Sequence, residues 1–351
     1  MTLIIVQTYF TPKQETRLEK MKTKTSRMAA CAFILLLFLT HGVMAHGQLQ
    51  PGTGKRPAVK IIYGALTTSN APIWIGADQG FYEKYGLDVT LVHGRGASPI
   101  LALAGGTVEI GHFAGASVMA ANLGGSDLVF VGAQTNYVVL SIWTRKDSAI
   151  KKLSELAGKT IGVSAPGSAT HTLTRLSLRK AGITDKDVKY IHHGSLPEIF
   201  VSLDKGLVDA GVASAPRPGF HELVDLATQR IPFLQGAIIV RRSYLQSQRP
   251  IMLNFLKAFV ESMKIAREKP DTVVPSLVKH LRVWPEVARE AYRSFANVWE
   301  EVPYVRTESV QAILDFQPKE SVKDITPEKY IDNSLIKELE TSGFMKALYR
   351  K

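Results

Sequence analysis

The stretch Lys159-Thr160-Ile161-Gly162-Val163-Ser164-Ala165-Pro166-Gly167-Ser168-Ala169-Thr170 predicts a strand, a turn and the start of a helix. It begins as a β-branched run, which is typical of a buried strand, and it breaks at Pro166-Gly167, which is a turn signal. Ser168 precedes a helical pattern and is a candidate N-cap. Such a turn directs unpaired backbone N–H groups and the positive end of the helix dipole to one point. The stretch therefore predicts either an ordinary capped helix or an anion site.

Strands and helices alternate with short links through the first two thirds of the chain, which favours parallel sheets covered by helices. We expect strands at residues 59–66, 87–92, 108–112, 128–133, 159–164, 188–192 and 208–213. We expect helices at residues 72–85, 99–104, 114–123, 168–181 and 218–226, and a further helix that starts at a capping box, Ser195-Leu-Pro-Glu198.

An internal repeat predicts two related α/β lobes. Residues 103–111 and 203–211 both read Leu-x-x-Gly-x-Val-acid-x-Gly, and Gly94 and Gly194 end the preceding strands. Strand-like residues 140–145 and 237–241 resemble each other, and we interpret them as the two crossings between the lobes.

From residue 250 onward the sequence is mainly helical, and this tail is expected to pack on the first lobe. Further helices are expected at residues 285–299, 308–316 and 327–340. The predicted domains are a signal peptide at 1–45, a linker at 46–57, lobe 1 at 58–137 and 238–351, and lobe 2 at 138–237.

The composition is that of a globular chain of 351 residues, 45% hydrophobic, with a net charge of +12. The basic residues are scattered and not interleaved with aromatic residues, so we expect no nucleic-acid partner. The single cysteine, Cys31, lies in the N-terminal apolar run, so the mature chain is expected to lack disulfides and thiolate chemistry. No phosphate loop, nucleophile elbow or metal-binding histidine pair is found. We therefore expect no catalytic residue, metal or cofactor.

The N-terminus is typical of a secretory signal peptide. Lys22, Lys24 and Arg27 precede an apolar run at residues 29–39, and small residues follow at 43–45. The run is short for a transmembrane helix. We predict a periplasmic protein, with Met21 as an alternative start and a retained membrane anchor as the competing interpretation.

Four segments resemble a known family: residues 71–74 (Ala-Pro-Ile-Trp), 80–89 (Gly-Phe-Tyr-Glu-Lys-Tyr-Gly-Leu-Asp-Val), 156–163 (Leu-Ala-Gly-Lys-Thr-Ile-Gly-Val) and 206–210 (Gly-Leu-Val-Asp-Ala). They are similar to the nitrate/sulfonate/taurine/bicarbonate group of periplasmic solute-binding proteins, and to the yeast thiamine-pyrimidine synthesis proteins. The likeness extends over residues 59–340. It implies a two-lobed periplasmic-binding-protein type II fold, each lobe a mostly parallel sheet flanked by helices.

The resemblance also implies a function. The protein would be the monomeric receptor of an ABC importer, with permease subunits and a cytoplasmic ATPase as partners. Its cargo would be a small anionic or polar solute of the sulfonate, nitrate, carboxylate or pyrimidine type. A sensing subunit of a signalling system is one alternative, and an enzyme like the yeast proteins is another. The yeast proteins have a cysteine-rich segment, which this chain lacks, so we expect no enzyme.

In open α/β sheets, ligands bind beyond the carboxyl ends of the strands, and this selects the expected solute-binding residues. They are Thr68, Ser69, Asn70, Trp74, His112, Gly115, Ala116, Asn136, Tyr137, Ser164, Gly167, Ser168, Ala169, Thr170, Ser214 and Pro216. Several have a structural alternative. Ser69 and Asn70 are also candidate helix caps, and Trp74 and His112 are also candidate core residues.

Overall fold

The computed structural model describes residues 55–64, 66–213, 219–317 and 319–350. The predicted signal peptide with Met21 and Cys31, most of the predicted linker, and the predicted site residues Ser214 and Pro216 lie outside the described residues. Of the helices that are described, none is both long enough and apolar enough to cross a membrane.

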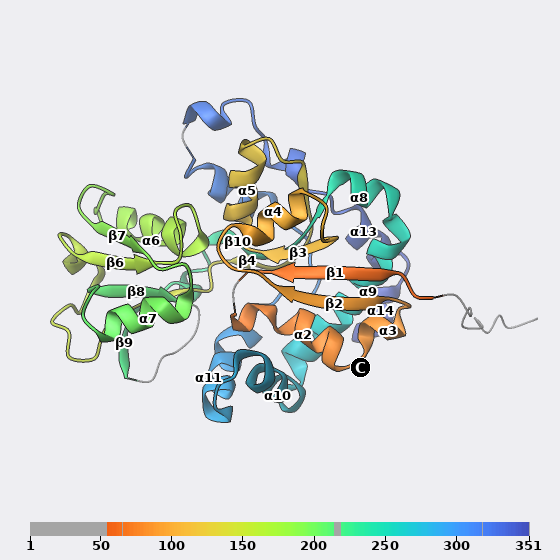
Figure 1. Ribbon diagram of the computed structural model, residues 1–351, viewed down its shortest axis with the longest axis horizontal. Helices are drawn as coiled ribbons and strands as arrows, with labels where there is room; N and C mark the ends of the chain where they lie inside the picture. Colours follow the sequence, from red (N-terminus) through yellow and green to blue (C-terminus); the bar gives the residue numbers. More distant parts are fainter. Residues whose placement is uncertain (1–54, 65, 214–218, 318, 351) are drawn as a thin grey trace, which may run out of the picture. The chain divides into compact units, whose positions relative to one another are not determined.

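Two five-stranded sheets form the framework (Figure 1). The first has the order β2-β1-β3-β10-β4, from β1 (Ala58–Tyr63), β2 (Asp88–His93), β3 (Ile110–Phe113), β4 (Leu128–Tyr137) and β10 (Pro232–Arg241). The second has the order β7-β6-β8-β5-β9, from β5 (Ser141–Arg145), β6 (Thr160–Val163), β7 (Lys189–His192), β8 (Ala210–Ala213) and β9 (Phe220–Asp225). In each sheet the fourth strand in the order, β10 or β5, is antiparallel to both neighbours. Both sheets are therefore mixed and follow one topology.

Helices follow most strands, as the alternation predicted. They are α2 (Ala71–Asp78), α3 (Phe81–Lys84), α4 (Ser98–Ala104), α5 (Gly115–Leu123), α6 (Ala169–Lys180), α7 (Leu196–Asp204), α8 (Arg242–Ser247), α9 (Arg249–Glu268), α10 (Pro270–Leu281), α11 (Pro285–Ala296), α12 (Thr307–Leu314), α13 (Ser334–Thr341) and α14 (Phe344–Tyr349). Short 3-10 turns are η1 (Thr68–Asn70), η2 (Leu153–Leu156), η3 (Ala227–Gln229), η4 (Lys319–Val322) and η5 (Pro327–Tyr330). The single helix expected at 72–85 is divided, because Gly80 adopts a φ of 68° that does not continue a helix.

Two predictions in this part were wrong. The helix expected at 218–226 is strand β9, which pairs with β5, and this long-range pairing overrides the local pattern. The strands predicted as crossings each lie inside one sheet, β5 between β8 and β9 and β10 between β3 and β4. The segments that connect the sheets are residues 138–140 and 226–231. A β-branched run indicates a strand but not the sheet in which it pairs.

The internal repeat has the same structural role in both sheets. The carboxylate of Glu109 accepts a hydrogen bond from the backbone N–H of Lys60, at 2.7 Å. The carboxylate of Asp209 accepts the corresponding bond from the N–H of Thr160, at 2.8 Å. Each acidic residue lies directly before its own strand and thus ties the start of that strand to the neighbouring strand.

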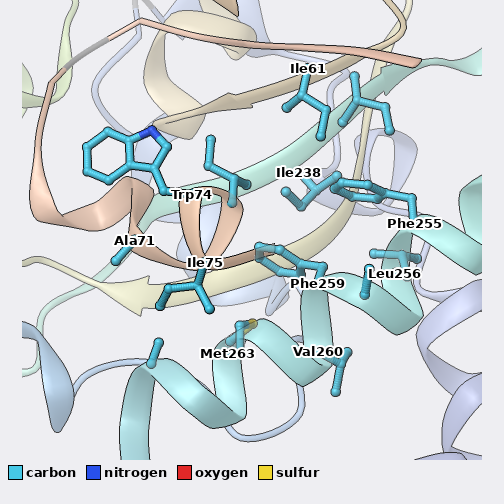
Figure 2. Close-up of a cluster of buried hydrophobic side chains, with 14 of the residues drawn as sticks. Ile61, Ala71, Trp74, Ile75, Ile238, Phe255, Leu256, Phe259, Val260 and Met263 are labelled. Atoms are coloured by element: carbon cyan, nitrogen blue, oxygen red, sulfur yellow. The ribbon is translucent and has the colours of Figure 1, made fainter. Parts of the chain in front are cut away.

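The C-terminal helices pack on the first sheet, as predicted. Figure 2 shows Phe255 and Phe259 of α9 in one cluster of buried side chains that also contains Trp74 of α2, Ile61 of β1 and Ile238 of β10. These five side chains are fully buried. Burial of a side chain of this size contributes about 1.5–3 kcal/mol, so α9 holds α2 and the strands that precede the site in place.

Candidate functional site

The turns after the parallel strands gather at one edge of each sheet. Strands β1, β3 and β4 run in the same direction, because β10 is antiparallel to both β3 and β4. At this edge of the first sheet Tyr137, the last residue of β4, pairs with Pro232. At the matching edge of the second sheet Ser141 pairs with Ala213 and Asp225. Both connections between the sheets therefore leave from the edges where the predicted site residues lie.

The turn at residues 164–170 closes on itself through side-chain hydroxyls. Ser168 caps α6, and its Oγ accepts a hydrogen bond from the N–H of His171 at 3.3 Å. The hydroxyl oxygens of Ser164, Ser168 and Thr170 lie 2.9–3.0 Å from one another. The capped helix is therefore confirmed. The N–H groups of Ala169 and Thr170, in the first turn of α6, have no partner within the helix.

Gly167 and His171 fix the shape of this turn. Gly167 has a φ of 69°, in the left-handed region that favours glycine. Its N–H donates to Nδ1 of His171 at 3.0 Å. Burial, with the nearby charge of Arg175, lowers the pKa of His171 below its usual range. The neutral ring is the form that accepts this bond, since a protonated imidazole carries a hydrogen on both nitrogens.

On the first sheet, Thr68, Ser69 and Asn70 form η1 immediately before α2. Asn70 occupies the N-cap position of α2, as its structural alternative predicted, but its side chain makes no capping hydrogen bond. Its Oδ1 lies instead 2.8 Å from Nδ1 of His112. The hydroxyls of Ser69 and Thr67 are hydrogen-bonded to each other. The hydroxyl of Thr68 is buried and has no partner among the described residues.

His112 is a hydrogen-bonded core histidine. Its Nε2 lies 2.8 Å from Oε1 of Gln134, and the ring is almost fully buried. Burial lowers its pKa to about 4, although the bond to Gln134 acts in the opposite direction. The ring is therefore neutral at pH 7 and carries one N–H, so the amide of Asn70 or Gln134 must present its nitrogen to the other ring nitrogen. Both nitrogens are occupied by protein partners.

Three more predicted site residues belong to the packed core of the first sheet. Trp74 is fully buried and stacks on His280, with ring centroids 4.9 Å apart. Its Nε1 has no acceptor among the described residues. Ala116 is also fully buried, and a Cβ on Gly115 would lie 2.7 Å from Cδ1 of Ile313 in α12. The core alternative therefore describes the position of Trp74, and Gly115 allows α12 to approach α5.

Asn136 joins the end of β4 to the C-terminal segment. Its Nδ2 donates to Oε1 of Glu300 at 3.0 Å and to the carbonyl of Tyr304 at 2.9 Å. Its Oδ1 accepts from the N–H of Arg306 at 2.9 Å and from the hydroxyl of Ser309 at 3.0 Å. These four bonds use the full hydrogen-bonding capacity of the amide, so Asn136 has a structural role.

Tyr137 follows Asn136 and lies close to two arginines. The guanidinium carbons of Arg230 and Arg306 are each 5.5 Å from the centre of its ring. Its hydroxyl accepts a hydrogen bond from Nη1 of Arg306 at 3.2 Å. Within the described part of the chain, no group of three or more histidine, cysteine, aspartate or glutamate residues is arranged to hold a metal ion.

A family model described as NMT1/THI5 like matches residues 67–273, which is more than half of the chain. The chain belongs to this family. No curated protein matches its sequence.

Solved structures show the fold of this NMT1/THI5-like protein. The periplasmic aliphatic sulphonate binding protein SsuA from Escherichia coli is 19% identical with a TM-score of 0.64, over 78% of this chain and 92% of that protein. The periplasmic nitrate-binding protein NrtA from Synechocystis PCC 6803 is 15% identical with a TM-score of 0.64, over 82% and 89%. The alkanesulfonate-binding protein SsuA from Xanthomonas axonopodis pv. citri is 16% identical with a TM-score of 0.64, over 81% and 98%. The predicted periplasmic-binding-protein fold is confirmed.

In this NMT1/THI5-like chain the structure also places residues at the sheet edges that the sequence did not single out for binding. Arg95, in the turn after β2, forms a 2.7 Å ion pair with Glu198 in α7. The predicted capping box is therefore wrong in its side-chain contacts, since Ser195 makes no side-chain cap and Glu198 bonds Arg95 instead. His193 follows β7 and buries an Nε2 that has no partner among the described residues. The only feature of the sequence that pointed to His193 was the pair of adjacent histidines at the end of a predicted strand.

Proposed function

We propose that this protein is an extracytoplasmic receptor that binds a small anionic or polar organic solute between its two sheets and delivers it to a permease. The observation that carries the proposal is the turn at residues 164–170. It presents the first-turn N–H groups of a capped helix and three clustered hydroxyls at the edge from which the connections between the sheets leave. A helix N-terminus of this kind suits an anionic group.

We further propose which of the predicted residues contact the solute. On the second sheet they are Ser164, Gly167, Ser168, Ala169 and Thr170. On the first sheet they are Thr68 and Ser69, since Thr68 has a buried hydroxyl without a described partner. Trp74, His112, Gly115, Ala116 and Asn136 support these turns from the core.

The wider role also remains a proposal. The lobes would comprise residues 58–137 with 238–351, and 138–237, except that residues 232–237 belong to β10 and therefore to the first sheet. A solute that touches both sheet edges would favour the closed arrangement, because only that arrangement makes both sets of contacts. The signal peptide would export the chain to the periplasm, where a monomer would deliver the solute to permease subunits driven by a cytoplasmic ATPase. Binding would involve no chemical step.

The names of the similar structures suggest which solutes to test first. We propose a thermal-shift screen of the chain from residue 46 onward with nitrate, alkanesulfonates, carboxylates and pyrimidines, after unfolding and refolding to remove bound solute. A ligand at a hundred times its dissociation constant adds about 2.7 kcal/mol of stability, which raises the melting temperature by several degrees. A shift confined to one class of solute supports the proposal. The absence of a shift with every class contradicts it.

A further inference from the structure

His171 holds the turn at 164–170 through two hydrogen bonds, although it is not among the residues predicted from the sequence. It lies in the first turn of α6, and its backbone N–H donates to Oγ of Ser168 at 3.3 Å. Its ring Nδ1 accepts from the N–H of Gly167 at 3.0 Å. Gly167 lies outside any helix or strand, so the ring of His171 fixes the direction of this N–H.

Two aromatic rings of β7 hold the His171 ring in place. The centre of the ring lies 4.7 Å from that of Tyr190 and 5.7 Å from that of His192, with interplanar angles of 74° and 86°. Such edge-to-face contacts favour a fixed orientation of the ring. Nδ1 therefore stays directed at Gly167 for as long as it can accept a hydrogen bond.

The surroundings of the ring disfavour its protonation. Burial is the largest cause that lowers the pKa of His171, followed by the charges of Arg175, one turn further along α6, and of protonated His192. The positive end of the helix dipole acts in the same direction. Asp185 raises the pKa, but its carboxylate also accepts hydrogen bonds of 2.8 and 2.5 Å from Arg175. Tyr190 stays neutral, because burial raises its pKa to about 12. His171 is therefore neutral at pH 7 and takes up its proton only in acid.

We propose that neutral His171 is the positioning residue of the solute turn, and that its protonation releases the N–H of Gly167 and weakens solute binding. This inference rests on the proposed solute site at residues 164–170. A protonated imidazole carries a hydrogen on Nδ1, so two N–H donors would face each other. The turn must then change shape, and the first turn of α6 loses the arrangement that suits an anion. The loss of one hydrogen bond corresponds to an affinity that falls about 3- to 10-fold.

Two substitutions separate the hydrogen-bond acceptor from the charge. In His171→Asn the side-chain oxygen takes the place of Nδ1, and an amide does not titrate, so the bond to Gly167 is kept in acid. His171→Leu removes the acceptor and the charge together. His221→Asn is the matched control, because His221 lies in β9, at the edge of the same sheet opposite β7.

The first measurement needs no solute. The chain is labelled with nitrogen-15 at glycine, and the amide resonance of Gly167 is assigned by its loss in Gly167→Ala. We expect this resonance to titrate in one step below pH about 6.5 in the unchanged protein and in His221→Asn, and to stay fixed in His171→Asn. A Gly167 resonance that does not respond to pH in the unchanged protein overturns the inference.

The second measurement is calorimetry with sodium nitrate and sodium ethanesulfonate as probes. Both are salts of strong acids and keep their charge, so any dependence on pH belongs to the protein. Between pH about 7.5 and about 5 we expect the affinity of the unchanged protein and of His221→Asn to fall about 3- to 10-fold. His171→Asn should bind as the unchanged protein does at the higher pH and lose this dependence, while His171→Leu should bind weakly at both.

The outcomes distinguish this inference from the proposed function. If a probe binds and His171→Asn keeps the full dependence on pH, the inference is overturned and the proposed function stands. Tighter binding in acid also overturns it, because the charge of the imidazolium would then attract the anion. If neither probe binds the unchanged protein at any pH, the assignment of an anion to this turn fails, and the inference fails with it.

Discussion

Gly167→Ala perturbs the proposed solute site through the backbone alone. An added Cβ would meet no atom within 4 Å, so steric contact contributes nothing. The cost comes from the φ of 69°, which an L-residue adopts at about 1–2 kcal/mol. Without solute, the variant can relax the turn to an unstrained φ, but solute binding requires the original φ. The strain energy therefore reduces the binding free energy. We expect affinity to fall by about 5- to 30-fold.

Gly182→Ala is the matched control for this variant. Gly182 lies just beyond the other end of α6, has a φ of 77°, and likewise has no atom within 4 Å of an added Cβ. Gly182→Ala should lose up to about 1–2 kcal/mol of unfolding free energy, measured by urea denaturation, and Gly167→Ala should lose less, because its free turn can relax. Only Gly167→Ala should weaken solute binding, measured by calorimetry with the solute found in the screen. Equal affinity in Gly167→Ala and Gly182→Ala would refute the placement of the solute at this turn.

Three further predictions concern stability and the contact between the sheets. Asn136→Ala should lower the unfolding free energy, measured by urea denaturation, by about 3–5 kcal/mol, because four hydrogen bonds lose their partner. Asn122→Ala removes only two hydrogen bonds and should lower the unfolding free energy by less. The pKa of His112 is about 4 in the folded protein, below its unfolded value near 6.5, so the unfolded chain binds the proton first. The unfolding free energy should therefore fall by about 3 kcal/mol as the pH drops from about 6.5 to 4. His112→Gln should reduce this dependence of stability on pH, and an unchanged slope would contradict the burial of a neutral His112. The ion pair of Arg95 with Glu198 is exposed, so Glu198→Gln should change solute affinity less than about fivefold, and a larger change that persists in about 1 M salt would show that solvent does not screen this pair.

Much of the fold could be predicted because its signals are local. The repeated Leu-x-x-Gly-x-Val-acid-x-Gly pattern indicated two related sheets, and the carboxylates of Glu109 and Asp209 indeed make the same bond in each. The cap at Ser168 was also correct, since it depends on atoms within three residues. Strand β9 could not be predicted in this way, because residues 220–225 become a strand through pairing with β5, which is distant in sequence.

The same difference between local and long-range interactions decides which parts of the candidate site could be predicted. Residue types and turn signals were enough to mark the turn at 164–170 and the polar residues after β1 and β3. They did not reveal that Asn136 would be used by residues 300–309.

Apart from β9 and the helix divided at Gly80, the alternation of strands and helices in the first two thirds of the chain follows from the sequence alone, as do the capped turn and the internal repeat, because backbone propensity and capping act over a few residues. The partners of Asn70, Glu198 and Arg230, and the burial of Trp74, were decided only by the tertiary structure. A polar side chain bonds whichever group the fold brings within about 3 Å, and that group is in most of these cases far away along the chain.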